Sequence, residues 1–165
     1  MFRCVVNRVS KADVVINGKS QGVLGHGLLV LFGVGSEAGA SLSDNTFPTV
    51  GVGLEKLADK ICGLRIFADA QGKMNLSVLN AEGGIYVVSQ FTLFADCKKG
   101  MRPSFTGAAP PAVARTHSHN FLQMIRLRMG VLQVFSGEFG ADMKLEFVND
   151  GPVTLILNAN AEGVQ

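Results

Sequence analysis

The sequence predicts an α/β protein, with residues 1–165 forming a single three-layer α/β/β domain built on a mixed sheet and β-hairpins. The hydrophobic fraction is 47% and the charged fraction 17%, a composition typical of one compact domain with a sizeable core. Helix-spaced and strand-like segments alternate in the middle of the chain, whereas strand-like segments adjoin one another at both ends. This order indicates helices on one face of a mixed sheet and β-hairpins in another layer.

The chain is expected to open with a meander of strands. Residues 2–9 and 12–17 are rich in β-branched side chains and are separated by Ser10-Lys11. Asn17-Gly18 is a strong turn signal. Residues 27–34, which read Gly-Leu-Leu-Val-Leu-Phe-Gly-Val, predict a strand buried on both faces.

A loop, a helix and a small turn are expected next. Residues 35–53 are rich in Gly and Ser and predict a surface loop. Residues 54–64 predict an amphipathic helix, because Leu and Ile recur at helical spacing while charged side chains take the other face. A turn at residues 69–73 and a short segment at 74–77 follow.

The second half predicts a strand, a helix and three further strands. Residues 85–93 are largely apolar, and residues 112–129 carry apolar side chains at helical spacing. The last strands are expected at residues 131–135, 143–149 and 153–158. Asn149-Asp150-Gly151-Pro152 is typical of a tight hairpin turn between the final two.

Composition excludes several classes of protein. A formal charge of +2 is too small for binding nucleic acid mainly through the net field. Cys4, Cys62 and Cys97 are odd in number and widely spaced, which argues against a disulfide framework or zinc site and favours a reducing compartment. The start of the chain does not resemble a signal peptide, and no apolar run is long enough to span a bilayer. We therefore expect a cytoplasmic protein that does not associate with a membrane.

Common catalytic and cofactor motifs are missing from the sequence. It contains neither a P-loop nor a G-x-S-x-G elbow. His117 and His119 lie two residues apart on a predicted helix, so they cannot form a metal-binding pair, and we expect both on its solvated surface. His26 is expected in a turn. No metal and no cofactor are predicted.

Two polar segments interrupt the apolar pattern. Ser89-Gln90-Phe91-Thr92 stands where a buried strand would carry valine or isoleucine, and buried polar groups require hydrogen bonds. Either this segment is an edge strand, or its backbone N–H groups and hydroxyls line a pocket. The interpretation of Gly151-Pro152 is also undecided at this point, since the segment is either a turn or part of a site.

Beyond these patterns, the chain resembles the D-aminoacyl-tRNA deacylase family, also called D-tyrosyl-tRNA deacylase. The similarity covers nearly the whole chain, because the matching segments occur in the family's order. They are Asn7-Arg8-Val9, Gly27-Leu28-Leu29-Val30-Leu31, Leu64-Arg65-Ile66-Phe67, Gly72-Lys73-Met74-Asn75-Leu76-Ser77, Val87-Val88-Ser89-Gln90-Phe91-Thr92-Leu93, Arg102-Pro103-Ser104-Phe105, Phe139-Gly140-Ala141-Asp142-Met143 and Val148-Asn149-Asp150-Gly151-Pro152-Val153-Thr154.

The resemblance implies the same three-layer fold, a homodimer and an enzyme that acts on the 3′ end of aminoacyl-tRNA. Such an enzyme hydrolyses the ester that links a D-amino acid, or mischarged glycine, to the terminal adenosine. The resemblance also implies that the Gly151-Pro152 bond is cis and enters the active site of the partner subunit. Its main-chain carbonyls would exclude an L side chain by steric clash.

Individual roles also follow from the resemblance. Ser89, Gln90, Phe91 and Thr92 would form the catalytic pocket. The N–H groups of Phe91 and Thr92 are suited to stabilising an oxyanion. No His or Lys is evidently placed to activate Thr92 as a nucleophile. The resemblance instead implies that the ribose 2′-hydroxyl of tRNA assists attack by water, with Thr92 binding or orienting the substrate.

Two further groups complete the expected site. Ala114, Phe139 and Met143, with the rest of residues 139–143, would form the adenosine-side wall. Lys98, Lys99 and Arg102 either contact tRNA phosphates or are solvated loop charges. The alternative function is a non-catalytic nucleic-acid-binding module that retains the fold. The sequence has no extended basic tail after Leu157, which favours the enzyme.

Overall fold

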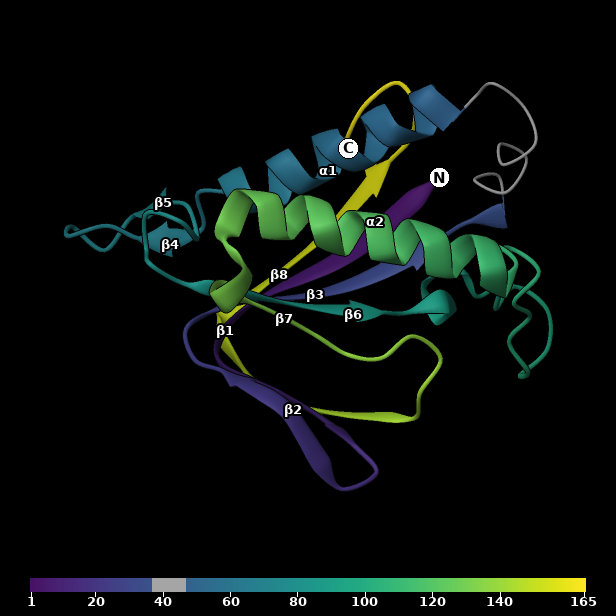
Figure 1. The fold of residues 1–165 in the computed structure, drawn as a ribbon, viewed down its shortest axis with the longest axis horizontal. Helices are drawn as coiled ribbons and strands as arrows, with labels where there is room; N and C mark the ends of the chain where they lie inside the picture. Colours follow the sequence, from purple (N-terminus) through teal and green to yellow (C-terminus); the bar gives the residue numbers. More distant parts are fainter. Residues whose placement is uncertain (37–46) are drawn as a thin grey trace.

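The computed structural model describes residues 1–36 and 47–165, and its central feature is a six-stranded sheet (Figure 1). The strands run in the order β2-β1-β3-β6-β7, and β8 pairs with β1. Two helices and a separate two-stranded sheet, β4-β5, complete the fold. The elements are β1 (Phe2–Ile16), β2 (Lys19–Leu24), β3 (Gly27–Val34), α1 (Phe47–Gly63), β4 (Phe67–Ala68), β5 (Met74–Leu76), β6 (Gly84–Ser89), the 3₁₀ helix η2 (Phe91–Phe94), α2 (Pro111–Met129), the 3₁₀ helix η3 (Val131–Gln133), β7 (Val134–Ser136) and β8 (Met143–Ala159).

The sheet is mixed, as predicted. Strand β1 pairs antiparallel with β2, β3 and β8, whereas β3, β6 and β7 run parallel to one another. Strand β3 is buried along almost its whole length, which confirms the prediction for residues 27–34. It is covered on both faces, so an uninterrupted apolar sequence suits it.

Three layers are present, which confirms the predicted α/β/β architecture. Helices α1 and α2 lie together on one face of the sheet (Figure 1), above a core that includes Phe32, Leu57 and Phe121. A second apolar cluster lies on the opposite face and includes Val14 and Tyr86. This cluster joins the far half of β1, β2 and the start of β8 to the centre of the sheet. The second β layer is therefore a continuation of the same sheet.

Both terminal strands are longer than the sequence predicted. Strand β1 continues through Ser10-Lys11, and β8 continues through the segment expected to form a hairpin turn. Each remains extended because the other pairs with it from Phe2–Ala159 to Ile16–Met143. Irregularities in the register between Asn7, Val9 and Lys11 absorb the local breaks.

Several other boundaries differ from the predictions. Helix α1 begins at Phe47, seven residues before the expected start at Leu54, and the part of the predicted loop at residues 37–46 lies outside the described residues. The strand expected at residues 131–135 is a 3₁₀ turn followed by a short strand. His119 is exposed as expected, but His117 is only 2% exposed because it packs against Phe2, with ring centroids 5.4 Å apart.

Within residues 1–36 and 47–165, the structure contains no helix with the length and apolar character needed to cross a membrane.

Candidate active site

A cavity of about 730 Å³ opens where β6 ends, between α2 and the start of β8. Strand β6 contributes its last residues, η2 its first, and the connection before α2 another wall. The lining residues are Phe32, Val34, Val88, Ser89, Gln90, Phe91, Phe105, Ala108, Ala109, Pro110, Pro111, Ala114, Ser118, Phe139, Gly140, Ala141, Asp142, Met143 and Leu145.

The floor of the cavity is built by a change of backbone direction after Ser89. Strand β6 ends there, the Gln90 N–H donates to the Phe32 carbonyl at 2.7 Å, and the chain enters η2. The N–H groups of Phe91 and Thr92 occupy the first turn of this 3₁₀ helix. Among the described residues neither donates a hydrogen bond, as expected for the first donors of a helix. Two backbone donors are thus available beside the cavity.

Helix α2 supplies the facing wall. Pro110 precedes the helix and Pro111 occupies its first turn, a position that suits proline because no N–H is needed there. The Ala114 side chain is buried, with 6% exposed, at the cavity wall. A small side chain at this point leaves the space open.

Most of the residues predicted to form the pocket do line this cavity. They are Ser89, Gln90, Phe91, Ala114, Phe139 and Met143. Thr92 is not among them, and its hydroxyl instead accepts a hydrogen bond from the Gln90 side chain. The edge-strand interpretation of this segment is wrong, because β6 ends at Ser89 and the chain then enters η2.

An exposed aromatic pair forms part of the cavity wall. Phe91 and Phe105 are 55% and 41% exposed, and their rings meet edge to face at 5.1 Å. Such a pair offers stacking surface to a planar ligand. Sequence reasoning did not assign Phe105 to the site, although it lies in one of the segments that carry the family resemblance.

The described lining of the cavity contains a single ionisable side chain, that of Asp142. Its carboxylate pairs with the Lys144 ammonium at 3.0 Å, and both side chains are largely exposed. The described lining therefore includes neither histidine nor lysine that could serve as a general base. The cavity can instead bind a substrate through backbone donors, hydroxyl groups and steric fit.

Gly151-Pro152 lies in a wide irregularity of β8. Thr154 pairs with Asn7 and Asn149 pairs with Val9, so residues 150–153 all lie opposite Arg8. The Gly151-Pro152 peptide bond is cis, as the resemblance implied, and both residues are exposed. The expected hairpin turn is wrong, because the chain resumes pairing with the same partner strand.

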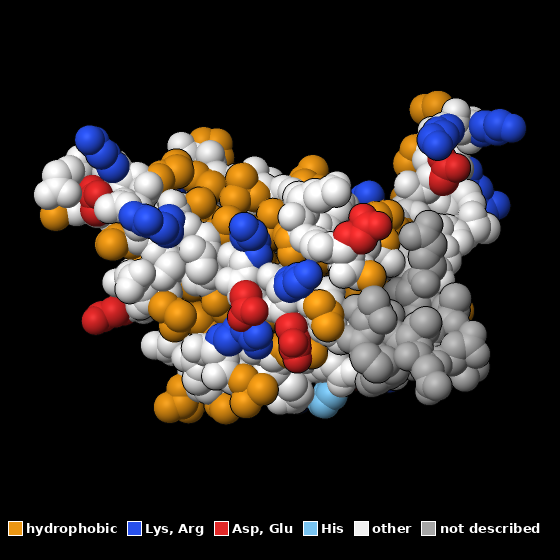
Figure 2. All heavy atoms as spheres, turned by 90° about the horizontal axis from the view of Figure 1, so that it is seen from above, with side chains coloured by type: hydrophobic (Ala, Val, Ile, Leu, Met, Phe, Trp, Pro, Cys, Tyr) orange, Lys and Arg blue, Asp and Glu red, His pale blue; other side chains and the backbone are white. Residues whose placement is uncertain are grey.

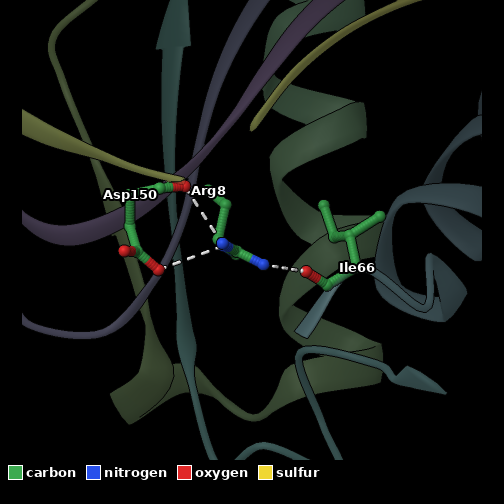
Figure 3. Close-up of polar contacts among 3 residues, drawn as sticks. All are labelled: Arg8, Ile66 and Asp150. Carbon is green, nitrogen blue, oxygen red and sulfur yellow. Dashed lines mark hydrogen bonds and ion pairs between the residues drawn. The ribbon is translucent and has the colours of Figure 1, made fainter. Parts of the chain in front are cut away.

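Arg8 anchors this segment, and its side chain lies between Asp150 and Ile66 (Figure 3). Its Nε lies 3.1 Å from Asp150 Oδ2 and donates to the Asp150 carbonyl at 3.2 Å, while Nη1 donates to the Ile66 carbonyl at 2.5 Å. The Thr154 hydroxyl adds a hydrogen bond of 2.8 Å to Asn7 Oδ1. Sequence reasoning assigned no role to Arg8, since only the paired strands place it beside Asp150.

Within one chain the two predicted motifs are not joined. Neither Gly151 nor Pro152 lines the cavity at Ser89–Phe91. Asp150 instead borders a separate hollow of about 370 Å³ with Arg8, His26 and Phe67. His26 is exposed there, in a bend as expected, with its ring 4.8 Å from that of Phe67.

The predicted phosphate contacts lie on the loop after η2. Lys98, Lys99 and Arg102 are all exposed, and none forms an ion pair with a described acidic residue. Figure 2 shows Lys and Arg side chains gathered at a projecting end of the molecule, on the side where Figure 1 has this loop.

Comparison with known proteins gives consistent matches. The family model described as D-Tyr-tRNA(Tyr) deacylase matches residues 5–158. A protein of Desulfatibacillum aliphaticivorans named D-aminoacyl-tRNA deacylase is 49% identical over 96% of this chain and 99% of its own length. One with the same name from Opitutus terrae is 47% identical over 97% of this chain and 99% of its own.

Two solved structures share the fold. One is named c-Myc DNA Unwinding Element Binding Protein, with a TM-score of 0.81 and 35% identity over 94% of this chain and 97% of that chain. The other is described as a probable eukaryotic D-amino acid tRNA deacylase, with a TM-score of 0.77 over the same shares of the two chains. At 18% identity, the second supports the fold alone.

Proposed function

The chain belongs to the D-Tyr-tRNA(Tyr) deacylase family and is a hydrolase of D-aminoacyl-tRNA, and from this premise we propose how its residues carry out the reaction. The observation that carries the proposal is the cavity at the end of β6, which has two unused backbone donors beside it and no basic side chain in its described lining. Asp142, the one ionisable side chain in that lining, is engaged by Lys144, so we assign the chemistry to positioned backbone groups and to the substrate itself.

In the proposed reaction, the terminal adenosine binds between Phe139, Met143 and Ala114, and its ester carbonyl lies over Phe91 and Thr92. The 2′-hydroxyl of the ribose assists a water molecule in attacking this carbonyl. The N–H groups of Phe91 and Thr92 stabilise the oxyanion that forms. The bond to the 3′ oxygen then breaks, the oxygen takes up a proton, and the free amino acid leaves with its carboxylate.

The remaining polar groups hold the substrate in place. Ser89 and Gln90 line the cavity, and the Gln90 side chain donates to the Thr92 hydroxyl. That bond supports an orienting role for Thr92 and gives it no base. Accurate orientation alone accounts for a large part of the rate enhancement in reactions of this type.

Selection for D-amino acids is assigned to Gly151-Pro152 of a second copy of the chain. Its carbonyls would occupy the space where the side chain of an L-amino acid must point. Glycine removes a Cβ beside the chiral centre, and the proline ring fixes φ. Mischarged glycine, which has no side chain, would pass the same filter. The exposure of both residues supports this placement.

A homodimer with active sites at the subunit interface follows from this assignment. Its support on the surface is a set of exposed apolar side chains on β8. Phe147, Val148 and Ile156 are 43%, 56% and 63% exposed, on either side of Gly151-Pro152 in the sequence. Among the described strands β8 pairs only with β1. Its other edge is open apart from Asn158 and Ala159, which pair with residues 164–165. Exposed apolar side chains along a strand are typical of an interaction surface.

The exposed Lys98, Lys99 and Arg102 would contact phosphates of the acceptor stem. A second candidate function, binding of nucleic acid without hydrolysis, is favoured by the similarity to the 35%-identical solved structure, whose name is that of a DNA-unwinding-element-binding protein. The enzyme accounts for the cavity as well as for the basic loop, and is therefore the preferred function.

Single-turnover and multiple-turnover deacylation of matched D-tyrosyl- and L-tyrosyl-tRNA distinguishes the candidates. The enzyme releases D-tyrosine with enzyme well below substrate, and leaves the L ester at its spontaneous rate. Binding of the tRNA with no acceleration of either ester would support the non-catalytic module. Equal acceleration of both esters would contradict the chiral filter.

A further inference from the structure

A second cavity, of about 470 Å³, adjoins the proposed active site along helix α2. Ser89, Ser118 and Phe139 line both spaces, so they form the shared boundary. The complete lining of the second cavity is Val87, Ser89, Arg115, Thr116, Ser118, His119, Asn120, Leu122, Ser136, Gly137 and Phe139. The reaction proposed above uses none of its residues beyond that boundary.

Seven of the eleven residues that line this cavity carry a side chain able to donate a hydrogen bond. Arg115 and His119 lie one turn apart on α2 and so face the same side of the helix. Hydroxyl groups and the amide of Asn120 surround them. No acidic residue is among the described residues that line this space, whereas Asp142 lines the neighbouring cavity. The two cavities therefore differ in charge, and the second is suited to an anion.

Arg115 lies at the boundary between the cavities. Its guanidinium carbon is 4.7 Å from the centroid of the Phe139 ring, which fixes the flat group against the shared wall. None of the described residues accepts a hydrogen bond or forms an ion pair with this guanidinium. A planar cation with free N–H groups, held at one orientation, matches the geometry of a phosphate.

We propose that this second cavity binds the phosphate that joins the terminal adenosine of the substrate to the preceding nucleotide, with Arg115 as its main contact. The inference rests on the proposed function, because it requires the terminal adenosine to lie against Phe139. The phosphate is attached to the same ribose that carries the ester, so it must leave the active site within a few bonds. It is also anionic in every substrate, whereas amino-acid side chains vary in charge.

The test compares two small substrates in the full-length protein. One is adenosine esterified with D-tyrosine, which lacks the phosphate, and the other is the dinucleotide CpA carrying the same ester. The measured quantity is the ratio of kcat/KM for the dinucleotide to that for the nucleoside. A ratio is independent of the fraction of folded enzyme, so partial misfolding of a variant does not distort it.

The Arg115→Ala variant should lower this ratio roughly ten-fold or more, as expected for loss of a charge-assisted hydrogen bond. Arg115→Lys should lower it less, because the charge remains but the planar fork is lost. Lys60→Ala, which removes one exposed positive charge at the end of α1 outside both cavities, should leave the ratio unchanged.

The inference is overturned if Arg115→Ala leaves the ratio at the wild-type value. It is also overturned if the change in kcat/KM that Arg115→Ala causes with the nucleoside ester differs between D-tyrosine and D-aspartate. The latter result would place the amino-acid side chain in the second cavity. Failure of the unaltered protein to hydrolyse D-tyrosyl-tRNA would instead contradict the proposed function, which keeps the two failures distinct.

Discussion

The Nε atom of Arg8 lies 3.1 Å from the Oδ2 atom of Asp150, and the same guanidinium donates to the main-chain carbonyl of Asp150 (Figure 3). Only 12% of the arginine side chain is exposed, whereas 48% of the aspartate side chain is exposed. This contact ties the residue immediately before Gly151-Pro152 to strand β1. The exposed motif therefore projects from an anchored base.

Replacing Arg8 with methionine should disturb the Gly151-Pro152 segment. The carbonyls of Asp150 and Ile66 would lose their donor, at a cost of about 1–3 kcal/mol each where they stay buried. We expect kcat/KM for D-tyrosyl-tRNA to fall at least ten-fold. Asp59→Asn, which breaks the remote Arg128–Asp59 pair at 2.6 Å, serves as the control and should retain activity. Wild-type kinetics in Arg8→Met would rule out the anchoring role.

Gly151→Ala should impair both the segment and the reaction. The residue has φ of +119°, and an added Cβ would lie 2.7 Å from Arg8 Nη2 and 2.9 Å from Val153 Cγ2. We expect a loss of about 1–3 kcal/mol in the free energy of unfolding and a large loss of deacylation. Gly72→Ala is the matched control, because φ is +76° there but no atom lies within 4 Å. It should lose stability without losing deacylase activity, as measured with D-tyrosyl-tRNA.

The backbone donors can be tested separately from the side chains. Thr92→Ala should retain substantial turnover, because no base is positioned to make this hydroxyl a nucleophile. Phe91→Pro removes an N–H at the first position of a helix, which tolerates proline, and Phe91→Ala controls for the lost ring. We expect kcat of the proline variant to be about 10²–10³-fold below that of the alanine variant. An inert Thr92→Ala protein that still binds tRNA would contradict this mechanism.

Tyr86 provides a test of the second core. Its side chain is fully buried, and its hydroxyl lies close to the Val14 backbone without forming a hydrogen bond of normal geometry within the described part of the chain. Tyr86→Phe should therefore raise the free energy of unfolding at pH 7, by about 1 kcal/mol. If chemical denaturation instead shows that the free energy of unfolding of Tyr86→Phe is lower than that of the wild type, the hydroxyl has a hydrogen-bond partner.

The same residue predicts a pH dependence. Burial raises the pKa of Tyr86 from 10.0 to about 12, and the charge of Asp13 adds to the shift. The unfolded chain releases this proton first, so stability is fully present below pH 10 and is lost as the pH rises toward 12. Because Tyr86 is the single tyrosine, ultraviolet absorbance reports its ionisation directly. The Tyr86→Phe variant should lose less stability over this range.

Those parts of the fold that depend on local pattern were predictable. The strand at 27–34 is apolar along its length because it is covered on both faces, and α2 follows its helical spacing. The breaks at Ser10-Lys11 and Gly151-Pro152 were misread as strand ends. Both segments continue because β1 and β8, which are separated by more than a hundred residues, pair over their full lengths. Such pairing leaves no local signal.

The site residues likewise fall into those that the sequence indicated and those that it did not. Polar residues after an apolar strand indicated the pocket at Ser89–Phe91, and the family resemblance supplied Ala114, Phe139 and Met143, which the fold brings to the same cavity. Arg8 and Arg115 had no such signal. Each acquires its significance from a contact across the fold, with Asp150 in one case and with the Phe139 ring in the other. Isolated arginines in a sequence do not reveal such partners.

The pocket of one subunit is proposed to work with Gly151-Pro152 of the other, and mixing two inactive variants tests this cooperation most directly. Phe91→Pro damages the pocket and Gly151→Ala damages the chiral segment. If the proteins exchange subunits at equal concentration, half of the dimers are mixed and each holds one intact site, so roughly a quarter of wild-type deacylation should return. Mixed dimers that form, as shown by capture through two different tags, yet remain inactive would contradict a shared active site.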